Sequence, residues 1–179
     1  MSFYTKTEIR RSVRKAIATL SEGERISQSA QIVSHIASLE EVQHAKVVAL
    51  FASLADEPQT ADFIQWAATH KYIVLPRIDG DDMDFYPYSP ESMQRGAFGI
   101  EEPQTEERTD PAEIDLIIVP GRAFTPQGKR LGRGRGYYDR YMSQSGFHAT
   151  KIGVCYKEQL VEEIPDEPHD ILMECVIYA

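Results

Sequence analysis

The residues best suited to chemistry lie in one stretch, Leu131–Tyr141, with the sequence LGRGRGYYDRY. Its three glycines alternate with Arg133 and Arg135. Glycine lets a backbone pass close to a ligand, and the forked guanidinium group of arginine matches phosphate oxygens. Asp139, just inside the helix expected to follow, offers the oxygen ligands that divalent metals prefer. The stretch therefore predicts a site for a metal-bound polyphosphate, and a basic surface loop that contacts RNA, or no ligand at all, is the alternative.

Two familiar nucleotide-binding motifs fit this region poorly. A P-loop has four residues between its first glycine and Gly-Lys-Ser/Thr, whereas six residues separate Gly121 from Gly128, and Arg130 stands where the hydroxyl should be. The dinucleotide fingerprint has glycines at its first, third and sixth positions. Counted from Gly132, the sixth position is Tyr137. A nucleotide site here must therefore be of another kind.

The composition is that of one ordinary globular domain, residues 1–179, with 42% hydrophobic and 26% charged residues. No apolar run approaches the ~20 residues that a membrane span needs, and the N-terminal residues have no apolar core of a secretory signal. Cys155 and Cys175 have no metal-binding spacing. We therefore expect reduced cysteines in a cytoplasmic protein, and a monomer, because no exposed apolar stripe is evident.

The charge of the chain is unevenly distributed. A net charge of −9 argues against non-specific binding to nucleic acid. However, residues 1–15 carry +4 and residues 122–140 carry +5, whereas residues 158–174 hold seven carboxylates and no lysine or arginine. Two basic segments on an acidic protein indicate a local site for a small anionic ligand. Solvated helix faces are the alternative explanation.

Four helices are predicted. Capping-box patterns at Thr5–Glu8 and Ser21–Glu24 begin the first two. Thr60 is expected to cap a third helix through residue 70, and a fourth is expected over residues 137–145. Helical spacing predicts these inward-facing residues for the first three helices: Ile9, Val13, Ile17 and Leu20; Ile26, Ala30, Val33 and Ala37; Phe63, Trp66 and Ala67.

Strands are predicted between and after these helices. They alternate with the helices through much of the chain, which indicates an α/β fold with a largely parallel sheet. Ligands of such sheets bind beyond the carboxyl ends of the strands, so the loops after Ser53, Ile78 and Val119 are the places to look. The predicted strands are Val47–Ser53, Tyr72–Ile78, Met83–Tyr88, Asp115–Val119, Lys151–Cys155 and Cys175–Tyr178.

Several blocks of residues together give the chain a resemblance to a known family. The strongest is VPGRAFTPQGKRLGRGRGYYDRY, residues 119–141. By the order and spacing of its blocks, the chain resembles the 5-formyltetrahydrofolate cyclo-ligase family (5,10-methenyltetrahydrofolate synthetases) over nearly its full length. The supporting blocks are Lys6-x-x-x-Arg10, Glu57-x-x-Thr60, Leu75-Pro76-Arg77, Phe98-Gly99-Ile100-x-Glu102-Pro103 and Gln159…Ile164-Pro165…His169-Asp170.

The resemblance implies a function and a fold. It implies an ATP- and magnesium-dependent enzyme that converts 5-formyltetrahydrofolate into 5,10-methenyltetrahydrofolate, with ADP and phosphate as the other products. ATP would phosphorylate the formyl oxygen, after which the N10 nitrogen of the folate closes the ring. The implied fold is a three-layer α/β/α Rossmann-like sandwich. The implied partners are these small molecules, with no nucleic acid and no membrane.

The resemblance also implies roles for individual residues. Glu57 would contact the folate, and Ala52, five residues before it, would line the same pocket. Asp139 would be a magnesium ligand, with Asp170 as a second acidic partner. Among the ATP-binding residues, Arg133 and Arg135 would act on the transferred phosphate. The complete ATP-binding set is Lys6, Arg10, Arg130, Gly132, Arg133, Gly134, Arg135, Gly136, Tyr137 and Tyr138.

Two functions of other classes compete with this interpretation. An RNA-associated α/β module would use the Gly-Arg loop for phosphate contact and the tyrosines for stacking, and its binding would depend strongly on salt. Another enzyme on a related fold, such as a sugar-phosphate isomerase, would need a general base and no ATP. None of the five histidines sits in a recognisable catalytic motif, which suits a reaction whose substrate supplies its own nucleophile.

Overall fold

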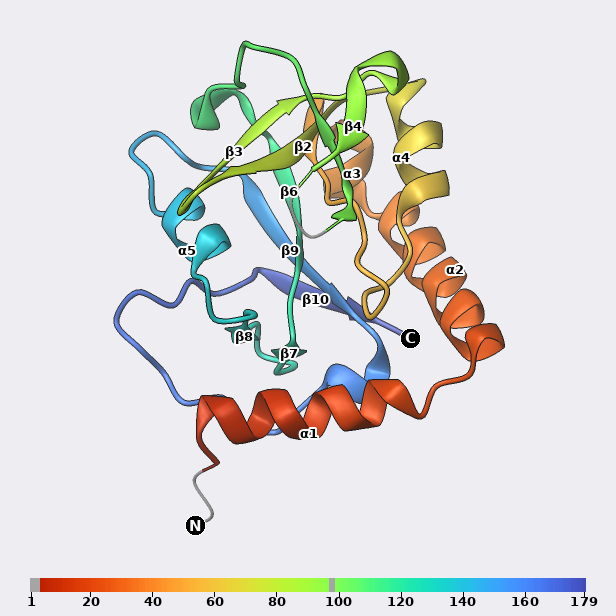
Figure 1. Ribbon diagram of the computed structural model, residues 1–179, viewed down its shortest axis with the longest axis vertical. Helices are drawn as coiled ribbons and strands as arrows, with labels where there is room; N and C mark the ends of the chain where they lie inside the picture. The colour runs from red at the N-terminus through yellow and green to blue at the C-terminus, as the bar shows by residue number, and fades with distance from the viewer. Residues whose placement is uncertain (1–3, 97–98) are drawn as a thin grey trace.

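A six-stranded sheet in the order β10-β9-β6-β1-β2-β3 forms the centre of the fold (Figure 1). The computed structural model describes residues 4–96 and 99–179, so Phe98 of the predicted family pattern lies outside the described residues. All neighbouring strands are parallel except β2 and β3, which form an antiparallel hairpin, so the predicted α/β fold is confirmed. The strands are β1 (Val47–Ala49), β2 (Tyr72–Asp79), β3 (Asp82–Pro87), β6 (Leu116–Pro120), β9 (Thr150–Cys155) and β10 (Cys175–Tyr178).

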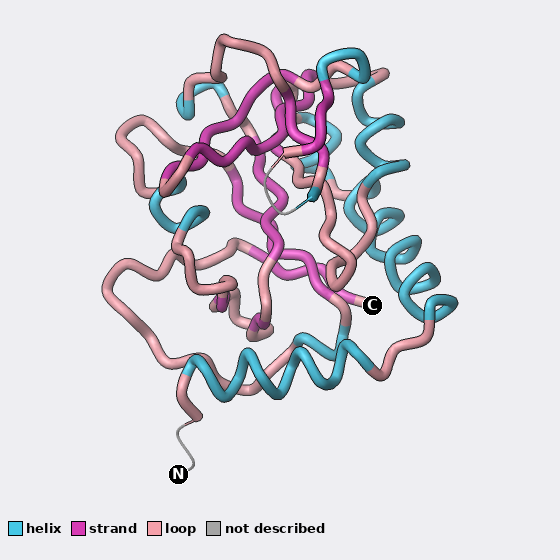
Figure 2. The backbone as a smooth tube through the Cα atoms, viewed as in Figure 1, coloured by secondary structure: helices cyan, strands magenta, loops and turns pink. Residues whose placement is uncertain are grey.

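Helices cover both faces of this sheet and give the three layers that the resemblance implied. Helices α1 to α4 share one core with the sheet, and α5 lies over the other face, which otherwise carries mainly loops (Figure 2). None of the described helices is long and apolar enough to span a membrane. The helices are α1 (Lys6–Ala18), α2 (Glu22–Ser38), α3 (Glu40–His44), α4 (Ala61–Ala68) and α5 (Tyr137–Met142).

Strand β6 shows why the sheet lies in the middle. Its five residues, Leu116–Pro120, are all buried, as expected for a parallel strand covered on both faces. Leu116 and Ile118 belong to the core on the side of α1–α4, whereas Ile117 and Val119 belong to the core on the side of α5. This alternation follows from the two-residue period of a strand.

Two short hairpins lie outside the main sheet and were not predicted. Strands β4 (Met93–Arg95) and β5 (Glu101–Pro103) pair between the predicted strands Met83–Tyr88 and Asp115–Val119. Strands β7 (Ala123–Phe124) and β8 (Arg130–Leu131) pair directly before the Gly-Arg loop. The second hairpin therefore ties the start of this loop to the end of β6.

The two capping boxes are present, but the predicted core face of α2 is partly wrong. Ile26 is 59% exposed and Ala30 is exposed, while the buried residues of α2 are Ser29, Ile32 and Ile36. The observed core face includes a buried polar contact. The hydroxyl of Ser29 accepts a hydrogen bond from the backbone N–H of Gln59 (3.0 Å) and lies 3.3 Å from the hydroxyl of Tyr156. The core face therefore runs through Ser29, Ile32 and Ile36 rather than through the positions that the spacing favoured.

The prediction for α4 needs two corrections. Trp66 does not face inward: it is 49% exposed and stacks on Phe63, with 5.7 Å between ring centroids. Thr60 stands at the N-cap position, but its hydroxyl does not cap the helix. The hydroxyl instead donates to the carbonyl oxygen of Phe51 (2.6 Å) and so ties the start of α4 to the segment after β1.

The elements also differ from the predictions in their ends. Strand β1 stops at Ala49 rather than Ser53, and α4 ends at Ala68 rather than residue 70. Helix α5 ends at Met142 rather than residue 145. The residues after β1 are buried or half-buried without being a strand, because they turn toward the site described below.

Candidate active site

A cavity of about 330 Å³ opens at the carboxyl ends of β1, β2 and β6, where the sequence predicted it. Leu54, Ile78 and Pro120 are part of its wall, so all three of the expected loops meet there. Much of the remaining wall is apolar, including Phe51 and Met83. The predicted site residues that line the cavity are Ala52, Glu57, Arg130, Gly132, Arg133, Arg135, Gly136, Tyr137 and Tyr138.

The Gly-Arg loop depends on glycine for its shape. Gly134 and Gly136 have φ angles of 104° and 69°, in the left-handed region that side chains rarely adopt. A Cβ atom on Gly136 would lie 2.8 Å from the Nη1 atom of Arg140. That guanidinium donates to the carbonyl oxygens of Arg135 (2.7 Å) and Asp81 (2.5 Å), which ties the loop to the turn between β2 and β3.

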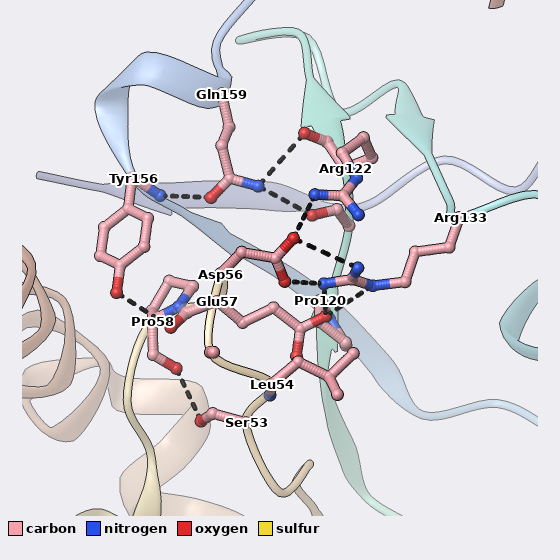
Figure 3. A network of polar contacts seen from close by, with 12 residues as sticks. Ser53, Leu54, Asp56, Glu57, Pro58, Pro120, Arg122, Arg133, Tyr156 and Gln159 are labelled. Carbon is pink, nitrogen blue, oxygen red and sulfur yellow. Dashed lines mark hydrogen bonds and ion pairs between the residues drawn. The ribbon is translucent and has the colours of Figure 1, made fainter. Parts of the chain in front are cut away.

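The guanidinium of Arg133 contacts two neighbouring carboxylates (Figure 3). Its Nη2 atom donates to Asp56 Oδ1 (2.5 Å) and to Glu57 Oε1 (2.8 Å), and its Nε atom lies 3.1 Å from Glu57 Oε1. Arg122 Nη1 donates to Asp56 Oδ2 (2.5 Å). The other oxygen of Glu57 accepts from the backbone N–H of Leu54 (3.0 Å). Two arginines and two carboxylates thus alternate in one network, of which Glu57 and Arg133 line the cavity while Asp56 and Arg122 lie behind them.

These contacts set the charge states of the network. Burial raises the pKa of Asp56, but hydrogen bonds from Arg133 and Arg122 outweigh burial and lower this pKa to about 2. Burial lowers the pKa of Arg133, while the hydrogen bond to Asp56 and the charge of Glu57 more than reverse this and raise it. Burial raises the pKa of Tyr138, and the charge of Glu57 raises it further. At neutral pH the Asp56–Arg133 pair is ionised and Tyr138 is a neutral phenol.

Arg130 and Asp139 form a second ion pair, which is more deeply buried. Arg130 Nη2 lies 2.7 Å from Asp139 Oδ2, and Arg130 Nη1 donates to the carbonyl oxygen of Pro120 (3.2 Å). The guanidinium carbon lies 5.5 Å from the centroid of the Tyr138 ring. Arg130 Nε is buried without a partner among the described residues. Asp139 Oδ1 accepts one long hydrogen bond from the backbone N–H of Ile171 (3.4 Å).

Helix α1 approaches the loop from its other side. Arg10 Nε donates to the carbonyl oxygen of Gly132 (2.9 Å), so this predicted phosphate-binding residue touches the loop. Lys6 instead pairs with Asp170 Oδ2 (2.6 Å) and Glu167 Oε2 (3.1 Å). Burial lowers the pKa of Lys6, but the hydrogen bonds to these carboxylates raise it above its usual value. The segment around Asp170 reaches Asp139 through Ile171, as described above.

The structure therefore divides the predicted site residues into two groups. Nine of them line the cavity, and the others lie beside it. The residues beside it are linked to the cavity through Arg130 and the Gly-Arg loop rather than by lining it. They are Lys6, Arg10, Gly134, Asp139 and Asp170.

Asp56 and Arg122 are the members of the network around Arg133 that the sequence prediction missed. Arg122 lies within the strongest family block and Asp56 immediately precedes Glu57, but no spacing rule links them. Two buried side chains support the backbones of the loops that carry Glu57 and Gly121. The hydroxyl of Tyr156 donates to the carbonyl oxygen of Glu57 (2.9 Å), and Gln159 Nε2 donates to that of Gly121 (2.8 Å). The network connects the turn after β1 with the end of β6 (Figure 3).

The cavity suits a ligand with two unlike parts. Its apolar wall can cover a planar ring, and a buried carboxylate can accept hydrogen bonds from ring N–H groups. The glycine-rich backbone and the arginines can bind phosphate. The geometry therefore favours a heterocyclic substrate beside a nucleotide over a long polyanion such as RNA.

Comparisons with known proteins identify one family over nearly the whole chain. Residues 3–179 match the model of the 5-formyltetrahydrofolate cyclo-ligase family. The 5-formyltetrahydrofolate cyclo-ligase of Mus musculus is 28% identical, with 97% of this chain and 93% of that protein aligned. The enzyme of the same name from Haemophilus influenzae is 31% identical, with 96% of both chains aligned.

Solved structures of similar proteins share the fold. The 5,10-methenyltetrahydrofolate synthetase of Aquifex aeolicus superposes with a TM-score of 0.86 and is 36% identical, covering 97% of this chain and 89% of that one. The 5,10-methenyltetrahydrofolate synthetase of Mycoplasma pneumoniae superposes with a TM-score of 0.77 and is 25% identical, covering 97% and 98%.

Proposed function

We propose, since the chain belongs to the 5-formyltetrahydrofolate cyclo-ligase family, that this enzyme converts 5-formyltetrahydrofolate into 5,10-methenyltetrahydrofolate. The conversion uses ATP and magnesium and releases ADP and phosphate. The observation that carries the proposal is that Glu57 and the Gly-Arg loop line one cavity at the carboxyl ends of the strands. The enzyme acts as a cytoplasmic monomer, and its two cysteines are free, which suits a reducing compartment.

The folate binds at the end of the cavity formed by Ala52, Glu57 and the apolar wall. Glu57 is 4% exposed, and each of its carboxylate oxygens already accepts a hydrogen bond, from Arg133 or from Leu54. A carboxylate has about four acceptor positions. Arg133 fills two of these positions at Oε1 and Leu54 fills one at Oε2, so one position is open to a ring N–H of a reduced pterin. A second N–H can be accepted when Arg133 turns from Glu57 to phosphate.

The ATP phosphates bind at the Gly-Arg loop. Arg133 and Arg135 both line the cavity, and Arg135 is exposed and forms no ion pair with any described residue. Arg10 reaches the loop backbone at Gly132 from helix α1. Guanidinium groups around the transferred phosphoryl group neutralise the charge that develops on its oxygens.

Magnesium would be held by carboxylates beside the loop. Asp139 and Asp170 supply the oxygen donors that this ion prefers, and the hydrogen bond between Ile171 and Asp139 brings the two segments together. Asp139 Oδ1 carries only that one long hydrogen bond, so it retains capacity for a ligand. Asp170 is paired with Lys6, and this lysine must therefore share it or release it. When bound with ATP, the ion would neutralise phosphate charge.

The chemistry needs positioning more than it needs a protein nucleophile. The formyl oxygen attacks the γ-phosphorus of ATP, and the bond between that phosphorus and ADP breaks. The N10 nitrogen then attacks the activated formyl carbon and loses its proton. The carbon–oxygen bond breaks, and phosphate leaves with the former formyl oxygen. The residues of this chain orient the two substrates and neutralise charge, which are the main contributions an enzyme makes to such a transfer.

The test is the appearance of 5,10-methenyltetrahydrofolate, followed by its near-ultraviolet absorbance. We expect product from 5-formyltetrahydrofolate with ATP and magnesium, and none when ATP is left out or magnesium is chelated. Released phosphate should equal the product formed. Absence of product in the complete mixture would contradict the proposed activity, and product formed equally well without ATP would contradict the proposed mechanism.

A further inference from the structure

We infer that Asp56 is a positioning residue that holds the guanidinium of Arg133 in place for phosphate binding. Asp56 is not part of the cavity wall, whereas Arg133 and Glu57 are. It therefore acts on the reaction through Arg133 rather than by touching a substrate. The inference rests on the proposed function, because it takes Arg133 as a residue that meets ATP.

The contacts of Asp56 engage both of its oxygens. Oδ1 accepts from Arg133 Nη2 (2.5 Å), and Oδ2 lies 3.4 Å from Arg133 Nη1 and 2.5 Å from Arg122 Nη1. The carboxylate thus faces one edge of the Arg133 guanidinium. Glu57 faces the adjoining edge, through Nε and Nη2. Because a guanidinium group is planar, contacts on two edges define the orientation of the whole group.

Asp56 can do this because its own position is anchored. Arg122, its second partner, has a side chain that is only 11% exposed, and its backbone N–H donates to the carbonyl oxygen of Leu131 (2.7 Å). The carbonyl oxygen of Arg122 accepts from Gln159 Nε2 (3.2 Å), and Gln159 is 1% exposed. Asp56 therefore links Arg133, which is on the loop, to a buried framework at the end of β6.

Arg133 keeps the freedom that a ligand-binding residue needs. Its side chain is 32% exposed, and two of its partners are carboxylates from one turn. A phosphate group can replace Glu57 on one edge while Asp56 keeps the other edge. The replacement leaves Arg133 neutralised and frees Oε1 of Glu57. In this arrangement Asp56 keeps its contact with Arg133 throughout, and a phosphate of ATP replaces Glu57 as the second partner.

A double-mutant cycle separates this role from a structural one. Asp56→Asn, Arg133→Ala and the double variant are compared with the parent for Kd of magnesium-ATP, by calorimetry without folate, and for kcat/KM. We expect Asp56→Asn to weaken ATP binding by about fivefold or more, because Arg133 loses the charged hydrogen bond that orients it and so makes only part of its contact with phosphate. In the Arg133→Ala background the same substitution should change Kd by less than about twofold, because residues acting through one another are not additive.

Three results would overturn the inference. Equal losses in both backgrounds would mean that Asp56 acts independently of Arg133. A parent-like Kd in Asp56→Asn would mean that it does not act at all. Tighter ATP binding in Asp56→Asn would mean that it competes with phosphate for Arg133. Folate KM should stay within about twofold of the parent, since the Glu57 carboxylate is retained.

Matched controls protect the test from folding effects. Asp84→Asn removes another carboxylate that pairs with an arginine, Arg108 (3.2 Å), outside the cavity, and should bind ATP like the parent. If Asp56→Asn fails to fold, Arg122→Lys is used, which keeps the charge but loses the fork that faces Asp56. Arg122→Lys should weaken ATP binding in the parent but not in the Arg133→Ala background. A loss of ATP affinity that persists in the Arg133→Ala background overturns the inference.

The binding measurement also keeps the two proposals apart. A parent that binds ATP but forms no methenyl product would overturn the proposed function, while the cycle in Kd would still report on Asp56. A parent that binds no ATP would overturn both. Normal turnover of the parent with an additive cycle would overturn only the role of Asp56.

Discussion

Arg130, in strand β8, and Arg133, in the Gly-Arg loop that follows, lie close together in the sequence but have opposite surroundings. The Arg130 side chain is 3% exposed and contacts one carboxylate, Asp139, together with the carbonyl oxygen of Pro120. The Arg133 side chain is 32% exposed and contacts two carboxylates. Neither pattern follows from the sequence, in which both arginines belong to one basic, glycine-rich stretch.

The difference in burial indicates that one arginine supports the structure of the site and the other binds its ligand. A buried guanidinium that has lost its water must keep its partners, because an unpaired charge in the interior is costly. A half-exposed guanidinium can exchange one anion for another at little cost. Arg130 therefore supports the wall of the cavity, whereas Arg133 is free to bind a ligand. The predictions below test this division, from the largest expected effect to the smallest.

Arg130→Met should have the largest effect on stability. It leaves the half-buried Asp139 and the Pro120 carbonyl without their partner, and breaking a buried pair in this way costs about 3–5 kcal/mol. Urea denaturation measures the change in free energy of unfolding. The double variant with Asp139→Asn should recover part of the loss. A midpoint equal to that of the parent would show that Arg130 does not support the wall.

Arg133→Ala should instead affect catalysis most. The loss of a charged hydrogen bond to phosphate, about 1.5–3 kcal/mol, lowers kcat/KM for ATP by about 10- to 150-fold. Stability should fall less than in Arg130→Met, because Asp56 keeps Arg122 and Glu57 keeps the N–H of Leu54. Arg135→Ala should act in the same direction with no loss of stability, since Arg135 forms no ion pair with the described residues. Unchanged ATP kinetics in both variants would contradict the assignment.

The ion pairs around Arg133 should also make the free energy of unfolding depend on pH. The pKa of Asp56 is lower in the folded protein, about 2, than its ordinary value of 3.8. A depressed pKa stabilises the fold above the unfolded value, and this stabilisation is lost as the pH falls from about 4 toward 2. Unfolding midpoints of the parent and Asp56→Asn, compared at pH 6 and pH 3, should therefore converge in acid. A difference that is the same at both pH values would contradict the ion pairing.

Lys6→Ala and Arg10→Ala should have only a small effect on stability. Each loses partly exposed contacts, to Asp170 and Glu167 or to Gly132, worth about 0.5–1 kcal/mol. Activity should fall more than this, because both charges lie beside the proposed phosphate site. Thermal melting and specific activity of the purified variants are the measurements. A large drop in melting temperature with normal activity would make the two residues structural.

The sheet was predictable because its signals are local and strong. The run Leu116–Val119 is apolar and largely β-branched, and such a run has few alternatives to a buried parallel strand. Capping boxes at Thr5 and Ser21 are equally local. The core face of α2 was not predictable, because it depends on Ser29 contacting Tyr156, a residue 127 positions away.

In the site, too, the features that depend on residues distant in the sequence could not be predicted. The Gly-Arg loop and Glu57 could be located from their motif, but the partners of Arg133 could not. Asp56 is 77 positions from Arg133 and 66 from Arg122, and only the fold brings them together. The burial of Arg130 depends in the same way on the β7–β8 hairpin, which is too short for any pattern to predict.

The most direct test of the proposed site is Glu57→Gln, with 5-formyltetrahydrofolate varied at saturating ATP. An amide offers one acceptor and one misplaced donor to the pterin, so we expect folate KM to rise at least tenfold, or about 1.4 kcal/mol. A folate KM and kcat within twofold of the parent would remove Glu57 from the site and contradict the assignment of the cavity to folate.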